Sequence, residues 1–395
     1  MGTTNVQQSY PNLHEDCKDL RNALRGISSN EKKVIEILGQ RNQSQRDSLS
    51  EAYKLVFGED LRKRLKSSIS GKLEKCLTLW MMDPFDRDAV LLNEALREGG
   101  PKKDRVIIGM LCTRTSKQIY LIKQAYYTMF NQTLESHIDG SGFAILEPQT
   151  KSKWAFWKGS EAKSKEPPKR VLAITKLLLA LARGSRPENT AVDRHFALSD
   201  AHHLNKVCTG KIGNEEMLIR IFTTRSSYQL SATMNYYQQH YGHDFEKVLS
   251  KQGSGEFLQA LRAALQSLRQ PSKFYAEELS DALSGIGTDE ETLVLIITTR
   301  AEVDMQFIKL EFMNECKRSL EDVVRDETIG KLRQLLLTIL GQGDMLFSPR
   351  PSNCSMAPSA TSYYTSPYGS RQPSDGSASY FSGSVGSSAP NSFQS

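Results

Sequence analysis

The stretch Leu293-Val294-Leu295-Ile296-Ile297-Thr298-Thr299-Arg300 decides the fold class, because an apolar run that ends in arginine occurs four times in the chain. The four arginines are Arg41, Arg114, Arg225 and Arg300. An aromatic residue follows twelve positions later and a large apolar residue follows twenty positions later: Tyr53 and Leu61, Tyr126 and Leu134, Tyr237 and Phe245, Phe312 and Leu320. A glycine comes 28 to 30 positions after each arginine, at Gly71, Gly142, Gly255 and Gly330. This agreement between four copies predicts a repeat protein.

The repeated segments are predicted to be helical. The residues around each apolar run follow a 3.6-residue period, and alternating strand patterns with Asn-Gly turns are missing from the sequence. We therefore expect an all-α body in which four units bury a shared core. The expected segments are a short head (1–13), repeat one (14–83), repeat two (84–148, with its last helix and a linker at 171–190), repeat three (191–270) and repeat four (271–346).

Two further segments depart from the repeat pattern. Residues 149–170 contain seven basic and two acidic residues and are expected to form a loop inserted into repeat two. Residues 347–395 are rich in Ser, Tyr, Pro and Gly, with 16 serines and three charged residues from position 348 onward. Such a composition buries too little apolar surface to offset the entropy of ordering, so we expect a disordered tail.

The inserted basic stretch is a candidate for membrane adhesion without calcium. Lysines are attracted to anionic headgroups, and tryptophans prefer the membrane interface. The candidate membrane-binding residues are Lys151, Lys153, Trp154, Trp157 and Lys158. The alternative is a solvated insertion that contacts nothing.

Composition limits the other classes of function. The 395 residues include 51 Lys and Arg and 45 Asp and Glu, and the resulting net charge of +6 is too small for a dedicated nucleic-acid binder. No window approaches the roughly 18 consecutive apolar residues of a membrane span, and the first residues lack the pattern of a secretory signal. Six cysteines without Cys-x-x-Cys spacing argue against a disulfide framework or a zinc cluster and favour a reducing cytosol.

The fourth copy carries a candidate calcium loop, residues 283–291, just before its apolar run. Two glycines allow a tight turn that presents carbonyl groups, and Thr288 with Glu291 is expected to form a capping box for the next helix. An acidic residue, Glu327, follows forty positions after the second glycine. Because Ca²⁺ prefers carbonyl and carboxylate oxygens, this pattern predicts a calcium site. The predicted ligands are the carbonyl oxygens of Leu283, Gly285 and Gly287 and the carboxylate of Glu327.

With this loop, its partner acid and the four repeats, the chain resembles the annexins over about 330 of its 395 residues. The stretch Trp80-Met81-Met82-Asp83-Pro84-Phe85-Asp86-Arg87-Asp88-Ala89 resembles the junction after the first repeat of plant annexins. The resemblance implies a curved disc of four repeats with about five helices each and calcium loops on the convex face. It also implies reversible, Ca²⁺-dependent binding of a cytoplasmic protein to acidic phospholipids of the plasma membrane or endomembranes.

The other three repeats depart from the calcium motif. Repeat one has Ser28 in place of the second glycine and Ser68 in place of the acid. Repeat two reads Gly99-Gly100-Pro101-Lys102-Lys103, with Asp139 as the candidate acid, and repeat three has Gln252 at the acid's position. Loss of the carboxylate removes the only charged ligand of a loop, so we expect one competent site, in repeat four.

Two short segments bear on further activities of plant annexins. Ile219-Arg220-Ile221 resembles a tripeptide proposed for actin contact, although the alternative, core packing, is favoured. Gln40 replaces the histidine that has been linked to peroxidase-like activity, and a phosphate-binding loop is missing, so we do not expect an enzyme. The leading hypothesis is a calcium-dependent membrane-binding protein. The alternative is a scaffold for membrane and cytoskeleton that acts largely without calcium through the basic stretch and the tail. The sequence does not determine the oligomeric state.

Overall fold

The fold was analysed in a computed structural model, which describes residues 12–26, 29–140, 172–209, 215–253, 255–284 and 287–346. Residues 208–209 and 342–346 are described by their backbone alone. Most of the predicted head, the inserted stretch 149–170 and the tail 347–395 lie outside the described residues, so the expectations about them remain predictions.

The described residues form twenty helices, five in each repeat. Repeat one contains α1 (Leu13–Ala23), α2 (Glu31–Gly39), α3 (Gln43–Phe57), α4 (Leu61–Ser68) and α5 (Gly71–Trp80). Repeat two contains α6 (Pro84–Glu98), α7 (Pro101–Thr113), α8 (Ser116–Phe130), α9 (Leu134–Ile138) and α10 (Leu172–Ala182). Repeat three contains α11 (Arg194–Thr209), α12 (Glu215–Thr224), α13 (Ser227–Tyr241), α14 (Phe245–Lys251) and α15 (Glu256–Arg269). Repeat four contains α16 (Pro271–Ser284), α17 (Glu290–Arg300), α18 (Met305–Cys316), α19 (Leu320–Glu327) and α20 (Gly330–Leu346).

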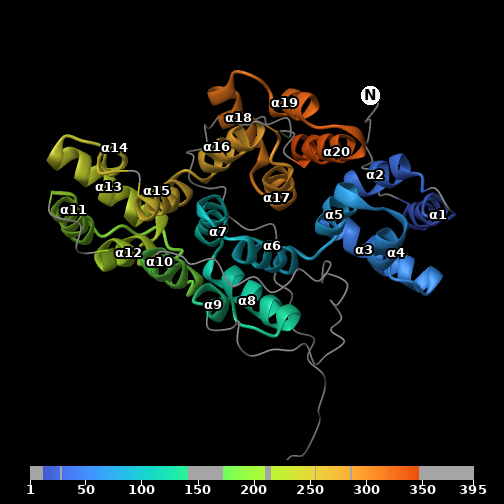
Figure 1. Cartoon of the computed structure of the whole chain (residues 1–395), viewed down its shortest axis with the longest axis horizontal. Coiled ribbons are helices and arrows are strands. Elements are labelled where there is room, and N and C mark those ends of the chain that lie inside the picture. Colours follow the sequence, from blue (N-terminus) through green and yellow to red (C-terminus); the bar gives the residue numbers. More distant parts are fainter. Residues whose placement is uncertain are drawn as a thin grey trace, which may run out of the picture. The chain divides into compact units, whose positions relative to one another are not determined.

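The second and fifth helices of the repeats take part in the contacts between repeats, in places with a first helix as partner. Helix α2 packs on α20, α15 packs on α7, and α17 contacts both α5 and α6. In Figure 1 the orange and red helices of repeat four accordingly lie beside the blue helices of repeat one. The buried apolar side chains of all four repeats form one continuous core. The expected all-α fold of four repeats is therefore confirmed, and within the described part of the chain no strand is found.

The repeated arginines owe their spacing to a buried ion pair. In the first three repeats each arginine pairs with an aspartate on the first helix of its own repeat, 25 or 26 positions earlier. The pairs are Arg41–Asp16 (2.7 Å), Arg114–Asp88 (2.7 Å) and Arg225–Asp200 (2.6 Å). Repeat four has Tyr275 at this position, and Arg300 lies over its ring at 4.7 Å and pairs with Asp304 instead.

The repeated aromatic and apolar positions are core positions. Tyr53, Tyr126, Tyr237 and Phe312 are each at most 2% exposed, so they fill the centre of each five-helix unit. Among the described residues no helix is both long enough and apolar enough to cross a membrane.

Candidate metal and membrane site

The candidate calcium loop of repeat four joins α16 to α17. The side chain of Asp289 caps α17 by accepting from the Thr292 amide (3.1 Å), and the Asp289 amide donates to the carbonyl of Ala282 (2.9 Å). The predicted capping box of Thr288 with Glu291 is therefore wrong. Asp289 is also a strong N-cap residue, and it starts the helix one position later than expected.

Thr288 has a different partner, which belongs to the far side of the repeat. Its hydroxyl group donates to the backbone carbonyl of Glu327, the last residue of α19, at 2.8 Å. This bond holds the end of α19 against the candidate loop, although the two segments are 39 positions apart. Glu327 is exposed, and among the described residues its carboxylate has neither a hydrogen bond nor an ion pair.

The predicted backbone ligands lie only partly within the described residues. Leu283 lies in the last turn of α16, directly after Ala282, and Gly285 lies outside the described residues. Gly287 has a φ of +89°, and a Cβ placed there would meet no atom within 4 Å. Carbonyl groups beside one unpaired carboxylate are the hard donors that Ca²⁺ prefers. Within the described part of the chain no three His, Cys, Asp or Glu side chains cluster as a metal site, so the candidate site depends on backbone oxygens.

Repeat one has the same loop closure without the acid. The amide of Asn30 donates to the carbonyl of Ala23 at 2.7 Å, which corresponds to the bond between Asp289 and Ala282. Ser68 ends α4 as Glu327 ends α19, and its hydroxyl group donates to the carbonyl of Leu24 at 3.2 Å. The carbonyl that corresponds to the Leu283 ligand is thus already bonded within the protein.

Repeats two and three also differ from repeat four. In repeat two Lys103 pairs with Glu98 (2.6 Å) and Glu291 (3.2 Å), so this lysine next to the predicted loop is held by two carboxylates. Asp139 is exposed at the end of α9. In repeat three residues 210–214 lie outside the described residues, and Gln252 is the C-cap of α14.

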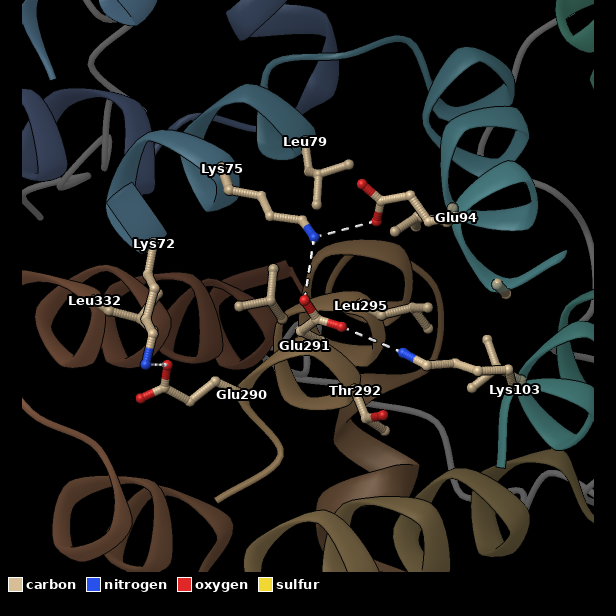
Figure 2. A pocket seen from close by; sticks show the side chains of 14 residues that line it. Lys72, Lys75, Leu79, Glu94, Lys103, Glu290, Glu291, Thr292, Leu295 and Leu332 are labelled. Carbon is tan, nitrogen blue, oxygen red and sulfur yellow. Dashed lines mark hydrogen bonds and ion pairs between the residues drawn. The ribbon is translucent and has the colours of Figure 1, made fainter. Parts of the chain in front are cut away.

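A pocket of about 110 Å³ lies between α5, α6, α7, α17 and α20 (Figure 2). Glu291 stands at its centre and bridges Lys75 of repeat one (3.5 Å) and Lys103 of repeat two (3.2 Å). Burial acts to raise the pKa of Glu291, but the two ammonium groups outweigh it and hold that pKa below its usual range. Burial raises the pKa of Glu94, which also pairs with Lys75 (3.2 Å).

The ion pairs of this pocket connect the candidate calcium loop with two other repeats. Glu290 and Glu291 form the first turn of α17, directly after the loop, and Glu290 pairs with Lys72 of α5. Sequence reasoning missed this cluster, because its charges come from three repeats and share no spacing along the chain.

The remaining predicted residues are placed as follows. Lys151, Lys153, Trp154, Trp157 and Lys158 lie outside the described residues. Ile219 and Ile221 are buried in α12, whereas Arg220 is exposed. Gln40 is the C-cap of α2.

Comparison with known proteins identifies the family. A sequence model of the annexin repeat matches residues 15–80, 87–142, 199–264 and 274–339. Human annexin A13 is 33% identical over 344 residues, which cover 86% of this chain and 100% of that protein. The annexin-like protein RJ4 of Fragaria ananassa is 34% identical over 338 residues, with coverage of 85% and 98%. The solved structure of annexin III superposes with a TM-score of 0.73 at 31% identity and covers 84% of this chain and 95% of its own.

One matched segment falls in each of the four units of helices described above, although the second ends at residue 142, before α10. The relatives include plant annexins, in agreement with the plant-type junction after repeat one. The predicted resemblance is therefore confirmed, and with it the general property of the family, calcium-dependent binding to acidic phospholipids. The chain belongs to the annexin family and is of the plant type.

Proposed function

We propose that this annexin binds acidic phospholipid membranes reversibly through one Ca²⁺ in repeat four, held by the carbonyls of Leu283, Gly285 and Gly287 and the carboxylate of Glu327. The observation that carries the proposal is the bond from Thr288 to Glu327, because it keeps the acid beside the loop. A single carboxylate leaves net positive charge on the ion, which can then attract a lipid phosphate.

The protein's own residues set the conditions for this binding. The bond between Asp289 and Ala282 ties the two ends of the loop together, so less ordering entropy is lost when an ion binds. The exposed carboxylate of Glu327 is bonded to no other group of the described residues, so Ca²⁺ does not have to displace one when it binds. In the cell we expect a cytoplasmic protein that moves to the plasma membrane or endomembranes when free Ca²⁺ rises.

Calcium titration by calorimetry tests the site. Wild type is compared with Glu327→Gln and with Glu51→Gln, a control that removes an exposed carboxylate from α3. We expect wild type and the control to bind Ca²⁺ alike and Glu327→Gln to lose the binding heat, while all three keep the same helical circular dichroism. Equal binding by wild type and Glu327→Gln would refute the assignment.

Co-sedimentation with vesicles tests the function. Vesicles of phosphatidylserine and phosphatidylcholine are pelleted over a series of free Ca²⁺ concentrations, and the bound fraction is expected to rise with Ca²⁺ and with the phosphatidylserine content. If Ca²⁺ produces no increase, the calcium-independent scaffold takes the place of this proposal.

We further propose that the stretch 149–170 adds adhesion without calcium through Lys151, Lys153, Trp154, Trp157 and Lys158. Its support is the excess of basic over acidic residues and the interleaved tryptophans. Deletion of residues 151–166 is expected to reduce vesicle binding in EGTA. Undiminished binding after the deletion would show that the stretch does not contact the membrane.

A further inference from the structure

In repeat one a guanidinium group reaches the carbonyl oxygen that corresponds to a predicted calcium ligand in repeat four. Leu24 occupies the position of Leu283. The helix caps Asn30 and Asp289 each come six positions later, and both loops close through the same backbone bond. The carbonyl of Leu24 accepts from Arg64 Nη2 as well as from the Ser68 hydroxyl group. A cation attached to the chain thus stands at the carbonyl where a free ion would stand in repeat four.

The charge of Arg64 is not compensated within the described part of the protein. The side chain is half-buried, and among the described residues it has no carboxylate partner and no acceptor other than Leu24. Its Nε atom is buried without a hydrogen-bond acceptor. A guanidinium group has five N–H donors in a planar fork that matches phosphate oxygens, so this arrangement favours an anion as the missing partner.

The helix that carries Arg64 favours anions along its whole length. Helix α4 has four basic residues and no acidic residue, whereas α19, its counterpart in repeat four, has four acidic residues and one basic residue. The acidic groups that precede α4 are already engaged, because Glu59 pairs with Arg21 and Asp60 caps the helix. The equivalent loops of repeats one and four are therefore contacted by helices of opposite net charge, α4 and α19.

An ion pair joins the helix that follows α4 to the helix that follows the candidate calcium loop. Lys72 lies in the first turn of α5, four residues after Ser68, and pairs with Glu290 in the first turn of α17, directly after the candidate calcium loop. This contact brings the end of α4, which bonds the carbonyl of Leu24, toward the helix that begins directly after the candidate calcium loop. This proximity favours a lipid phosphate over a phosphate in free solution as the partner.

From these contacts we infer that Arg64 takes the place of calcium in repeat one and binds the phosphate group of an anionic phospholipid without any metal. The inference rests on the proposed membrane binding, but not on the calcium site of repeat four. The guanidinium group bonds the loop with one N–H group and offers others to the phosphate oxygens. Repeat one is then a permanent anion site beside a calcium-dependent one.

Vesicle co-sedimentation in EGTA, with the full-length protein, separates this site from a diffuse basic patch. Arg64→Ala is compared with Lys63→Ala, which removes an equal charge from an exposed position on the same helix. A diffuse contribution is worth about fivefold in affinity for each basic residue. Loss of a charge-assisted hydrogen bond is expected to weaken binding of phosphatidylserine vesicles by about tenfold or more. Equal losses in the two variants would overturn the inference.

A second variant guards against misfolding of Arg64→Ala. Ser68→Glu keeps the guanidinium group but gives it an internal carboxylate, so we expect the same loss of calcium-free binding with unchanged circular dichroism and melting temperature. Wild-type binding by Ser68→Glu would overturn the inference. Calorimetry with inorganic phosphate alone distinguishes a lipid phosphate from a free phosphate as the ligand. If the protein binds inorganic phosphate while all variants bind vesicles equally, the assignment to lipid is overturned.

The two proposals fail separately. Glu327→Gln tests the calcium proposal in the presence of Ca²⁺. The Arg64 variants test the second proposal in EGTA, where no variant has Ca²⁺ at the repeat-four site.

Discussion

The ion pair between Arg46 and Glu302 gives the strongest quantitative prediction, because it joins repeat one to repeat four through a fully buried charge. Arg46 is 0% exposed and Glu302 is 12% exposed. The two carboxylate oxygens of Glu302 accept from Arg46 at 3.2 and 3.0 Å, and the guanidinium carbon lies 3.6 Å from the centre of the Trp80 ring. Burial lowers the pKa of Arg46, and Glu302 opposes that shift.

The substitution Glu302→Gln leaves this guanidinium group buried without its counter-ion. Breaking a buried pair from one side typically costs about 3–5 kcal/mol. The glutamine retains one acceptor oxygen, and the carbonyl of Arg41 and the side chain of Gln43 still accept from Arg46. These remaining acceptors reduce the cost, so we expect the free energy of unfolding to fall by about 2–4 kcal/mol.

Urea unfolding measures this loss as a lowered midpoint at constant slope. Glu36→Gln is the control, because the Lys32–Glu36 pair is 4.0 Å long with side chains 69% and 49% exposed. Such a surface pair contributes about 0.3–0.5 kcal/mol. If Glu302→Gln costs no more than the control, buried charge does not hold repeats one and four together and the reasoning is wrong.

Three further outcomes follow from the structure. Gly287→Ala puts a side chain at a φ of +89° where no atom obstructs it, so we expect strain of about 1–2 kcal/mol and weaker calcium binding in calorimetry, with the fold retained. Burial raises the pKa of Cys76 to about 12 and that of Cys112 to about 11, so a thiol reagent on the native protein should label the half-buried Cys316 long before either, as mass spectrometry of peptides would show. Burial raises the pKa of Glu94, so its contribution to stability is present below the unfolded-state pKa and is lost as pH rises through the folded-state pKa. The stability of wild type relative to Glu94→Gln, from urea unfolding, should therefore fall as pH rises above the ordinary glutamate pKa of about 4.3.

The repeat architecture could be predicted because each repeated position has a local physical reason. The aromatic position fills the centre of each unit, and in the first three repeats the arginine neutralises an aspartate that is buried or half-buried. Asp16, Asp88 and Asp200 precede the repeated arginines by 25 or 26 positions, so this further repeated position could have been found in the sequence. Their absence from repeat four could not be interpreted without seeing Tyr275 under Arg300.

The details of the site could be predicted only in part. Two neighbouring residues, Thr288 and Asp289, can each cap a helix, and the tertiary contact of Thr288 with Glu327 decides between them. The sequence shows that Ser68 stands in place of the acid, but it does not show that Arg64 reaches the loop there. Arg64 lies four positions earlier on α4, and only the packing of that helix on the loop brings its guanidinium group to the carbonyl of Leu24.

The opposite charges of α4 and α19 give the two loops different roles at one surface. If Arg64 binds lipid phosphate as inferred, it holds the protein near anionic lipid at resting calcium, and the ion pair between Lys72 and Glu290 connects repeat one to the helix that follows the second loop. Binding at the second site is then effectively intramolecular, so its affinity adds to that of the first without any new contact. The calcium concentration required for membrane binding therefore depends on Arg64 as well as on Glu327, although calcium binding without membranes depends on Glu327 and not on Arg64.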